Sequence, residues 1–262
     1  MQAFAYQTPA SVAEAARAGA VDDTRFIAGG QTLLASMKLG LAAPATLVDL
    51  TKIAGLSGIT VSAGTVTIGA TTTHAAVAAS KDVAAAIPAL ADLAGKIGDR
   101  QVRNRGTIGG SLANNDPAAC YPAAVLALNA TIVTDRRSIA ADDFFKGLYE
   151  TALAAGEVIT SVSFPIPEKA AWQKFVQPAS RFSLVGVFVA KTASGPRVAV
   201  TGAGACVFRA SGVEAALAAN WSQAAAAGVK VSADGLNSDL HGSAAYRAAL
   251  IPVLAGRAVA AA

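Results

Sequence analysis

The sequence predicts an α+β protein of two parts, and three observations lead to this prediction. Short apolar strands alternate with short helices through the first two thirds of the chain. A strand hairpin follows, and the last stretch again has helical spacing. Pro165, Pro167 and nearby charged residues interrupt the strand pattern between the two parts. The boundary is therefore expected near residues 165–174.

The first part is expected to alternate between strands and helices. Ser11 begins a helix with Glu14 completing a capping box, and Pro88 marks a break or a first turn inside a helical stretch. The expected strands are 24–28, 46–50, a pair within 58–73 that turns at 62–64, 130–134 and 157–165, and the expected helices are 11–19, 33–39, 74–79, 83–96 and 121–128. No element is assigned to the polar, glycine-rich stretch 98–117.

The second part is expected to begin with strands and end with helices. Residues 182–191 and 196–201 form a hairpin around Ala193-Ser194-Gly195, and 202–208 extend its second strand. Helices are expected over 213–219 and 243–261.

Composition and charge exclude several classes of function. The 262 residues carry 21 Lys and Arg against 17 Asp and Glu, and the basic residues are scattered, which disfavours nucleic-acid binding. Hydrophobic residues make up 53% of the chain, but about a quarter of the chain is alanine. The longest uncharged run, 53–80, is rich in Gly, Ser and Thr, so no membrane span is expected. Because no signal peptide is recognisable, we expect a cytoplasmic protein.

The chain has few residues that could hold a metal or act as a nucleophile. Cys120 and Cys206 are far apart and have no metal-ligand spacing, and an iron–sulfur cluster takes four thiolates. His74 and His241 are the two histidines, so a histidine metal site or a Ser-His-Asp triad is hard to assemble. We expect His74 to start or cap a helix, His241 to lie on the surface, and both thiols to be inert.

Two glycine pairs give the strongest chemical signal. Ala28-Gly29-Gly30-Gln31-Thr32-Leu33 stands between a strand and a helix, and Thr107-Ile108-Gly109-Gly110-Ser111 adds two hydroxyl groups. Glycines let the backbone approach an anion, and successive N–H groups at a helix start can hold a phosphate. Each pair alone is also the pattern of a plain turn. Neither pair follows the common nucleotide-binding fingerprints, so two loops converging on one pyrophosphate is the better hypothesis.

The residues around the second pair make the pattern recognisable. Gln101-Val102-Arg103-Asn104-Arg105-Gly106 precedes it, and Asp116-Pro117-Ala118-Ala119 follows it. In order, spacing, length and its tail (241–247), the chain resembles the FAD-binding medium subunit of molybdenum hydroxylases. This group contains aerobic carbon monoxide dehydrogenase and bacterial xanthine dehydrogenases. The resemblance covers nearly the whole chain.

The resemblance implies both a fold and a division of labour. A PCMH-type FAD-binding domain of two α/β lobes, about 1–55 and 56–170, precedes a smaller C-terminal flavoprotein domain, 171–262. FAD lies on this chain and takes electrons from [2Fe-2S] clusters on a small partner subunit. It passes them to an external acceptor, while a molybdenum cofactor on a large subunit oxidises CO, an aldehyde or an N-heterocycle. A dimer of such heterotrimers is the family expectation.

The resemblance also implies the residues that contact the cofactor. They are Phe26, Ile27, Ala28, Gly29, Gly30, Gln31, Thr32 and Leu33 in the first loop, Thr107, Ile108, Gly109, Gly110 and Ser111 in the second, and Asp116, Ile159, Lys174 and Phe182. Lys174 stands where some members have a basic residue near the flavin, and Phe182 where many have an aromatic residue beside the ring. Val158 or Ile159 would line the adenine or ring pocket. No catalytic residue and no metal ligand is assigned.

Each of the outlying positions also has a purely structural interpretation. Asp116 suits an Asx turn before Pro117, Lys174 a solvated surface and Phe182 the core. The sequence departs from the family at Cys120, where an acid is common, and at Arg181, where an Asp is frequent. A cation at that position could favour a reduced anionic flavin or point to solvent.

Two other functions stay open from the sequence. A stand-alone flavin oxidase would need a substrate domain larger than the roughly 90 residues that follow Lys174. The second is a non-catalytic FAD-binding or assembly protein. Its only support is that Cys120 stands where an acidic residue is common in the family. Rapid flavin turnover with added acceptors would distinguish an electron-transfer subunit from an assembly protein.

Overall fold

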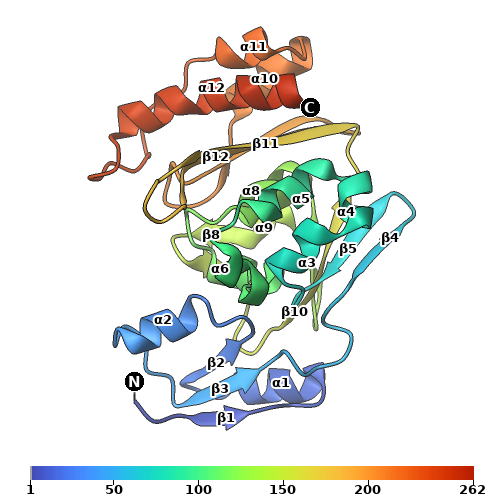
Figure 1. Cartoon of the computed structure of the whole chain (residues 1–262), viewed down its shortest axis with the longest axis vertical. Coiled ribbons are helices and arrows are strands. Elements are labelled where there is room, and N and C mark those ends of the chain that lie inside the picture. The colour runs from blue at the N-terminus through green and yellow to red at the C-terminus, as the bar shows by residue number, and fades with distance from the viewer. Residues whose placement is uncertain (1) are drawn as a thin grey trace.

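The computed structural model describes residues 2–262 and has three parts stacked along its long axis (Figure 1). At one end lies a small N-terminal lobe with a three-stranded parallel sheet of order β1-β3-β2. Its elements are β1 Ala5–Gln7, α1 Val12–Gly19, β2 Thr24–Ile27, α2 Leu33–Lys38 and β3 Thr46–Asp49. The capping box is confirmed, because Ser11 accepts the Glu14 N–H and the Glu14 carboxylate accepts the Ala10 N–H.

The second lobe forms the middle of the molecule around an antiparallel sheet of order β4-β5-β10-β6-β7. The sheet strands are β4 Ile59–Ser62, β5 Thr65–Gly69, β6 Thr131–Thr134, β7 Ser138–Ala140 and β10 Ile159–Pro165, and β8 Phe145–Gly147 pairs with β9 Glu150–Thr151. The helices are α3 His74–Ala79, α4 Lys81–Ala86, α5 Pro88–Gly95, α6 Arg100–Arg105, α7 Ile108–Asn114, α8 Tyr121–Ala127 and α9 Ala141–Phe144. Pro88 occupies the first turn of α5, as expected.

The stretch left without elements, 98–117, contains two helices. Asp99 starts α6 by accepting the Val102 N–H at 2.8 Å, and Thr107 starts α7 by accepting the Gly110 N–H at 3.2 Å. Both are strong N-cap residue types, but the glycines between them suggested a loop. The second glycine pair therefore lies inside the first turn of a helix.

The C-terminal domain has an antiparallel sheet of order β11-β12-β13-β14 covered by helices on one face (Figure 1). The elements are β11 Lys169–Val176, β12 Ser183–Thr192, β13 Gly195–Thr201, β14 Phe208–Arg209, α10 Ser211–Ala219, α11 Gln223–Ala227 and α12 Ala244–Ala261. β11 was not expected. The extension of the second hairpin strand over 202–208 is wrong, because Gly202, with φ of 83°, turns the chain after Thr201.

The C-terminal sheet packs on both of its faces. One face, with Trp172 and Phe188, joins the hydrophobic core of the second lobe, and the other packs against α10, α11 and α12. By length and composition α12 could cross a membrane, but half of it is buried in this core. The N-terminal lobe has a much smaller core, formed by Ala15, Val48 and Ile53 together with Leu56 and Val158 of the second lobe. This sparse contact leaves a cleft between the first two lobes.

Candidate functional site

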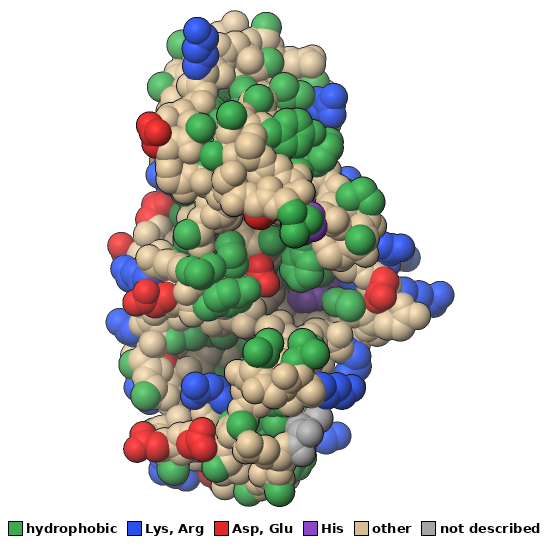
Figure 2. Space-filling model, turned by 90° about the vertical axis from the view of Figure 1, so that its left-hand side faces the viewer, with side chains coloured by type: hydrophobic (Ala, Val, Ile, Leu, Met, Phe, Trp, Pro, Cys, Tyr) green, Lys and Arg blue, Asp and Glu red, His purple; other side chains and the backbone are tan. Residues whose placement is uncertain are grey.

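A cleft of about 710 Å³ lies between the N-terminal lobe, the second lobe and one edge of the C-terminal domain. Figure 2 looks onto the side where hydrophobic side chains surround a hollow in the middle of the molecule. The volume is in the range of small-molecule and cofactor sites. All the predicted cofactor-contact residues line this cleft except Ile108, which is fully buried in the core.

The first glycine loop presents unpaired backbone donors. β2 ends at Ile27, Gly30 has φ of 70°, and α2 begins at Leu33. Within the described chain, none of the backbone N–H groups from Gly29 to Leu33 donates a hydrogen bond to protein. A run of such donors at the wall of a cleft is a site for an anion.

The two glycine-rich regions touch each other. A Cβ atom at Gly29 would lie 2.2 Å from the carbonyl oxygen of Arg105 and 2.8 Å from the Cα of Gly106. Such distances are far below van der Waals contact, so only glycine fits at position 29. The prediction that the two loops converge thus agrees with the geometry.

The second loop does not offer backbone donors as the first does. The N–H groups of Ile108 and Gly109 donate to the carbonyls of Thr72 and Ala70, at 3.1 and 2.8 Å. Those of the next two residues, Gly110 and Ser111, are taken by Thr107. The second loop can therefore contribute its hydroxyl groups and its small surface, whereas the amides come from the first loop.

Lys174 and Cys120 lie together at the cleft wall on the side of the C-terminal domain. The Lys174 ammonium donates to the Lys96 carbonyl at 3.1 Å and lies 3.4 Å from Cys120 Sγ. Cys120 is buried, and its Sγ is 3.7 Å from the Ser183 hydroxyl. Lys174 is therefore a positioned cation rather than a freely solvated one.

A short turn carries the aromatic residue to the cleft. The Gln177 side chain accepts the N–H groups of Ala179 and Ser180, and Arg181 has φ of 62°. Phe182 is half exposed, so it is not a core residue, and both Arg181 and Phe182 line the cleft. An aromatic face and a second cation are thus available near Lys174.

Asp116 has the structural role that its sequence context suggested. Its Oδ1 accepts the Ala118 N–H at 2.8 Å, which closes an Asx turn, and its Oδ2 accepts the Tyr149 hydroxyl at 3.4 Å. Burial and the Asp116 charge raise the pKa of Tyr149 above its usual value. Asp116 also lines the cleft.

Two of the titratable cleft residues that were not expected from the sequence have strongly lowered pKa values. Glu157 accepts two hydrogen bonds from Arg137, both at 2.9 Å, and these, with the Ala154 N–H and the Thr134 hydroxyl, lower its pKa to about 2. His74 starts α3, but Thr73 provides the cap. Burial lowers the pKa of His74 to about 4, with a further contribution from Arg103. A single histidine after three threonines gave no signal for a position in the cleft.

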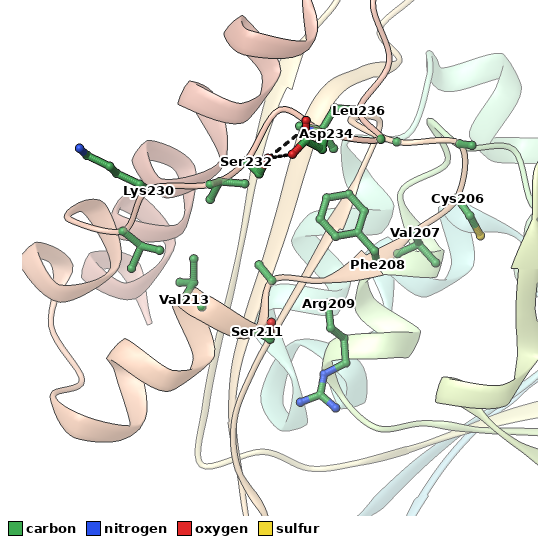
Figure 3. Close-up of a pocket in the computed structure, with 17 residues that line it drawn as sticks. Cys206, Val207, Phe208, Arg209, Ser211, Val213, Lys230, Ser232, Asp234 and Leu236 are labelled. Carbon is green, nitrogen blue, oxygen red and sulfur yellow. Dashed lines mark hydrogen bonds between the residues drawn. The ribbon is translucent and has the colours of Figure 1, made fainter.

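A second pocket, of about 480 Å³, lies in the C-terminal domain between β14, the start of α10 and the segment 229–236 (Figure 3). Its charged groups are engaged or turned outward. Arg209 pairs with Glu214, Asp234 accepts the Ser232 hydroxyl, and Lys230 extends away from the pocket. None of the predicted site residues lies there. Within residues 2–262, no three His, Cys, Asp or Glu residues form a group that could hold a metal.

Comparison with known proteins gives the family. Residues 2–167 match the family described as the FAD binding domain in molybdopterin dehydrogenase. The chain belongs to this family. The flavoprotein is 37% identical to the nicotine 6-hydroxylase medium subunit of Paenarthrobacter nicotinovorans, over 99% of this chain and 97% of that one. It is 35% identical to the carbon monoxide dehydrogenase medium chain of Hydrogenophaga pseudoflava, over 98% and 96%.

Solved structures agree with this assignment. Carbon monoxide dehydrogenase from Hydrogenophaga pseudoflava matches with a TM-score of 0.90 and 35% identity, over 100% of this chain and 97% of that chain. Quinoline 2-oxidoreductase from Pseudomonas putida 86 matches with a TM-score of 0.91 and 33% identity, over 100% and 97%. The α+β prediction is confirmed. The flavoprotein is the FAD-binding medium subunit of a molybdenum hydroxylase and hence an oxidoreductase subunit.

The cleft fits the cofactor of the family. Its volume suits an extended dinucleotide, and the amides of the first loop are unpaired where an anion would lie. Gly29 keeps the loops in contact, and Lys174 with Phe182 supplies a cation and an aromatic face beyond them.

Proposed function

We propose that the chain acts in the cytoplasm within a dimer of heterotrimers, beside a small iron–sulfur subunit and a large molybdopterin subunit. Relatives named as medium subunits or medium chains support a multi-subunit complex. When bound, FAD supplies the chemistry that links iron–sulfur clusters, which pass one electron at a time, to an external acceptor. The observation that carries the role of FAD on this chain is the run of unpaired amides from Gly29 to Leu33 in a cleft of dinucleotide size.

Different residues of the cleft are proposed to bind FAD and to set the flavin potential. We assign the pyrophosphate to the amides of the first loop and to the Ser111 hydroxyl. Ile159 forms an apolar wall, and Phe182 covers the flavin ring. Lys174 and Arg181 would place positive charge beside the flavin, and positive charge there would favour the reduced cofactor. No acid, base or nucleophile of this chain is needed for substrate oxidation, which belongs to the large subunit.

The substrate class of the whole complex follows from its relatives. Their names include carbon monoxide, nicotine and glyceraldehyde. We therefore propose CO, an aldehyde or an N-heterocycle. The FAD-binding domain is assigned to 1–170, with lobes of about 1–55 and 56–170, and the C-terminal flavoprotein domain to 171–262.

The experiment is anaerobic rapid mixing of the purified three-subunit complex with its substrate. Absorption of the clusters and of the flavin is recorded separately, and quinone, cytochrome, NAD or oxygen is then added. Flavin reduction that follows cluster reduction, and rapid reoxidation by one acceptor, is the expected result. A flavin that stays oxidised while the clusters cycle would support the assembly-protein alternative. Flavin reduction by substrate with the isolated chain would support a stand-alone oxidase.

A further inference from the structure

His74 is a buried side chain with one ring nitrogen left without a partner. The residue is 5% exposed, and its Nδ1 is fully covered without any hydrogen bond in the described chain. The ring lies against Tyr121, with centroids 5.3 Å apart and planes tilted by 49°. Because burial also lowers its pKa to about 4, the imidazole is neutral at physiological pH and carries one proton.

The surroundings of the two nitrogens decide which one holds that proton. A buried N–H without an acceptor is rare in proteins and less favourable than a buried lone pair. Nδ1 is in such a place, whereas Nε2 is not fully covered and His74 lines the cleft. The favoured tautomer therefore has its proton on Nε2, where it can be donated to a ligand.

Nε2 lies next to Gly106, which in turn contacts the first glycine loop. A Cβ atom at Gly106 would be 2.6 Å from His74 Nε2, and a Cβ atom at Gly29 would be 2.8 Å from the Cα of Gly106. Gly106 thus separates the imidazole from the loop that carries the unpaired amides. Both His74 and this loop line the same cleft.

The cation next to His74 is already engaged. The Arg103 guanidinium donates to the carbonyls of Ile97 and Gly98, at 3.0 and 3.1 Å. Its charge favours an anion nearby and disfavours a protonated imidazole. A neutral N–H donor is consequently the group that His74 can offer.

We propose that His74 donates its Nε2–H to a phosphate oxygen of the bound dinucleotide, beside the amides of Gly29 to Leu33. This proposal rests on the proposed FAD function and adds a binding residue from the second lobe. The N–H donor of the ring then has an acceptor, whereas Nδ1 keeps a buried lone pair. The pyrophosphate would be held from both lobes, by amides on one side and by imidazole on the other.

The test compares two substitutions of the same residue. His74→Phe fills the buried space without a donor, and His74→Gln places an amide N–H close to the position of Nε2. We expect His74→Phe to raise the FAD dissociation constant roughly 10- to 100-fold, the range for a hydrogen bond to a charged group. His74→Gln should stay closer to the wild type. Equal FAD affinity of His74→Phe and wild type would overturn the proposal.

A second measurement does not depend on the folding of a His74 variant. His241→Gln removes the other histidine, so that nitrogen NMR of the ring reports His74 alone. We expect the proton on Nε2 and a shift of its resonance when FAD binds. A proton on Nδ1, or an Nε2 resonance that FAD leaves unchanged, would overturn the proposal while the FAD function stands. Absence of FAD from the wild-type complex would overturn both.

Discussion

The contact between Gly29 and the backbone before the second loop gives the sharpest structural prediction. In Gly29→Ala the new methyl group would lie 2.2 Å from the Arg105 carbonyl oxygen and 2.7 Å from its carbonyl carbon. Position 29 does not have positive φ, so alanine adds no backbone strain there. The cost is therefore steric, and both partners are backbone that cannot turn away like a flexible side chain.

The size of the effect follows from this geometry. Overpacking of a close contact costs about 1–3 kcal/mol. Because the core that joins the N-terminal lobe to the second lobe is small, we expect the two lobes of the FAD-free variant to move apart and relieve the clash. The loops must come together again to hold one ligand. Most of the cost should then appear as an FAD dissociation constant raised roughly 5- to 100-fold.

The assay is titration of the FAD-free protein with FAD, followed by the change in flavin fluorescence, with chemical unfolding of the FAD-free protein alongside. Gly212→Ala, in α10, is the matched control, because a Cβ atom at Gly212 would lie 3.5 Å from Val229, an ordinary van der Waals distance. Losses in FAD affinity and in unfolding free energy should together reach about 1–3 kcal/mol. If Gly29→Ala changed neither quantity, the two loops would not be in contact and the cleft would be wrongly described.

Three further predictions concern charge. Lys174→Met should lower the flavin midpoint potential by on the order of 20–40 mV, as a positioned cation is lost, while Lys230→Met leaves the potential unchanged in the same spectroelectrochemical titration. Because the pKa of His74 is lower in the folded than in the unfolded protein, the unfolded protein takes up a proton on this ring at a higher pH. The free energy of unfolding should therefore fall by about 3 kcal/mol as the pH drops from 6.5 to 4. This part of the pH dependence should vanish in His74→Phe when unfolding is measured across that range, and an unchanged slope would count against a buried neutral ring. The pKa of Glu157 is also depressed, so its contribution is present above pH 4.5 and lost as the pH falls toward 2. Glu157→Gln should lower the free energy of unfolding at pH 7 by about 2 kcal/mol, a figure that allows for the half-exposed side chain of its partner Arg137. The variant should also lose less stability than the wild type as the pH falls. Equal midpoints of acid unfolding in the two proteins would contradict the ion pair.

Local patterns predicted the first lobe well. The apolar run 24–28, the glycine pair and the helical spacing after Leu33 are all short-range features, and the structure forms the strand, turn and helix in that order. Around 100–114 the local signal was mixed. Glycine and polar residues suggested a loop. In the structure, the side chains of Asp99 and Thr107 cap the N-termini of two helices.

The finer details of the site depend on contacts between distant segments. The amide of Gly109 is engaged because Ala70 places its carbonyl there, and that of Gly29 is not. Two similar glycine pairs therefore differ in a way that no local pattern shows. His74 likewise lies in the cleft because α3 packs against α5 and α6. Its sequence context suggested only a helix start.

We expect this chain to hold FAD in the cleft between its first two lobes. The most direct measurement is the visible absorption spectrum of the purified complex and of the chain alone, with the released cofactor identified after denaturation. We predict a flavin spectrum and one FAD per chain, with flavin content reduced in Gly29→Ala. A complex without flavin, even after incubation with excess FAD, would contradict the claim.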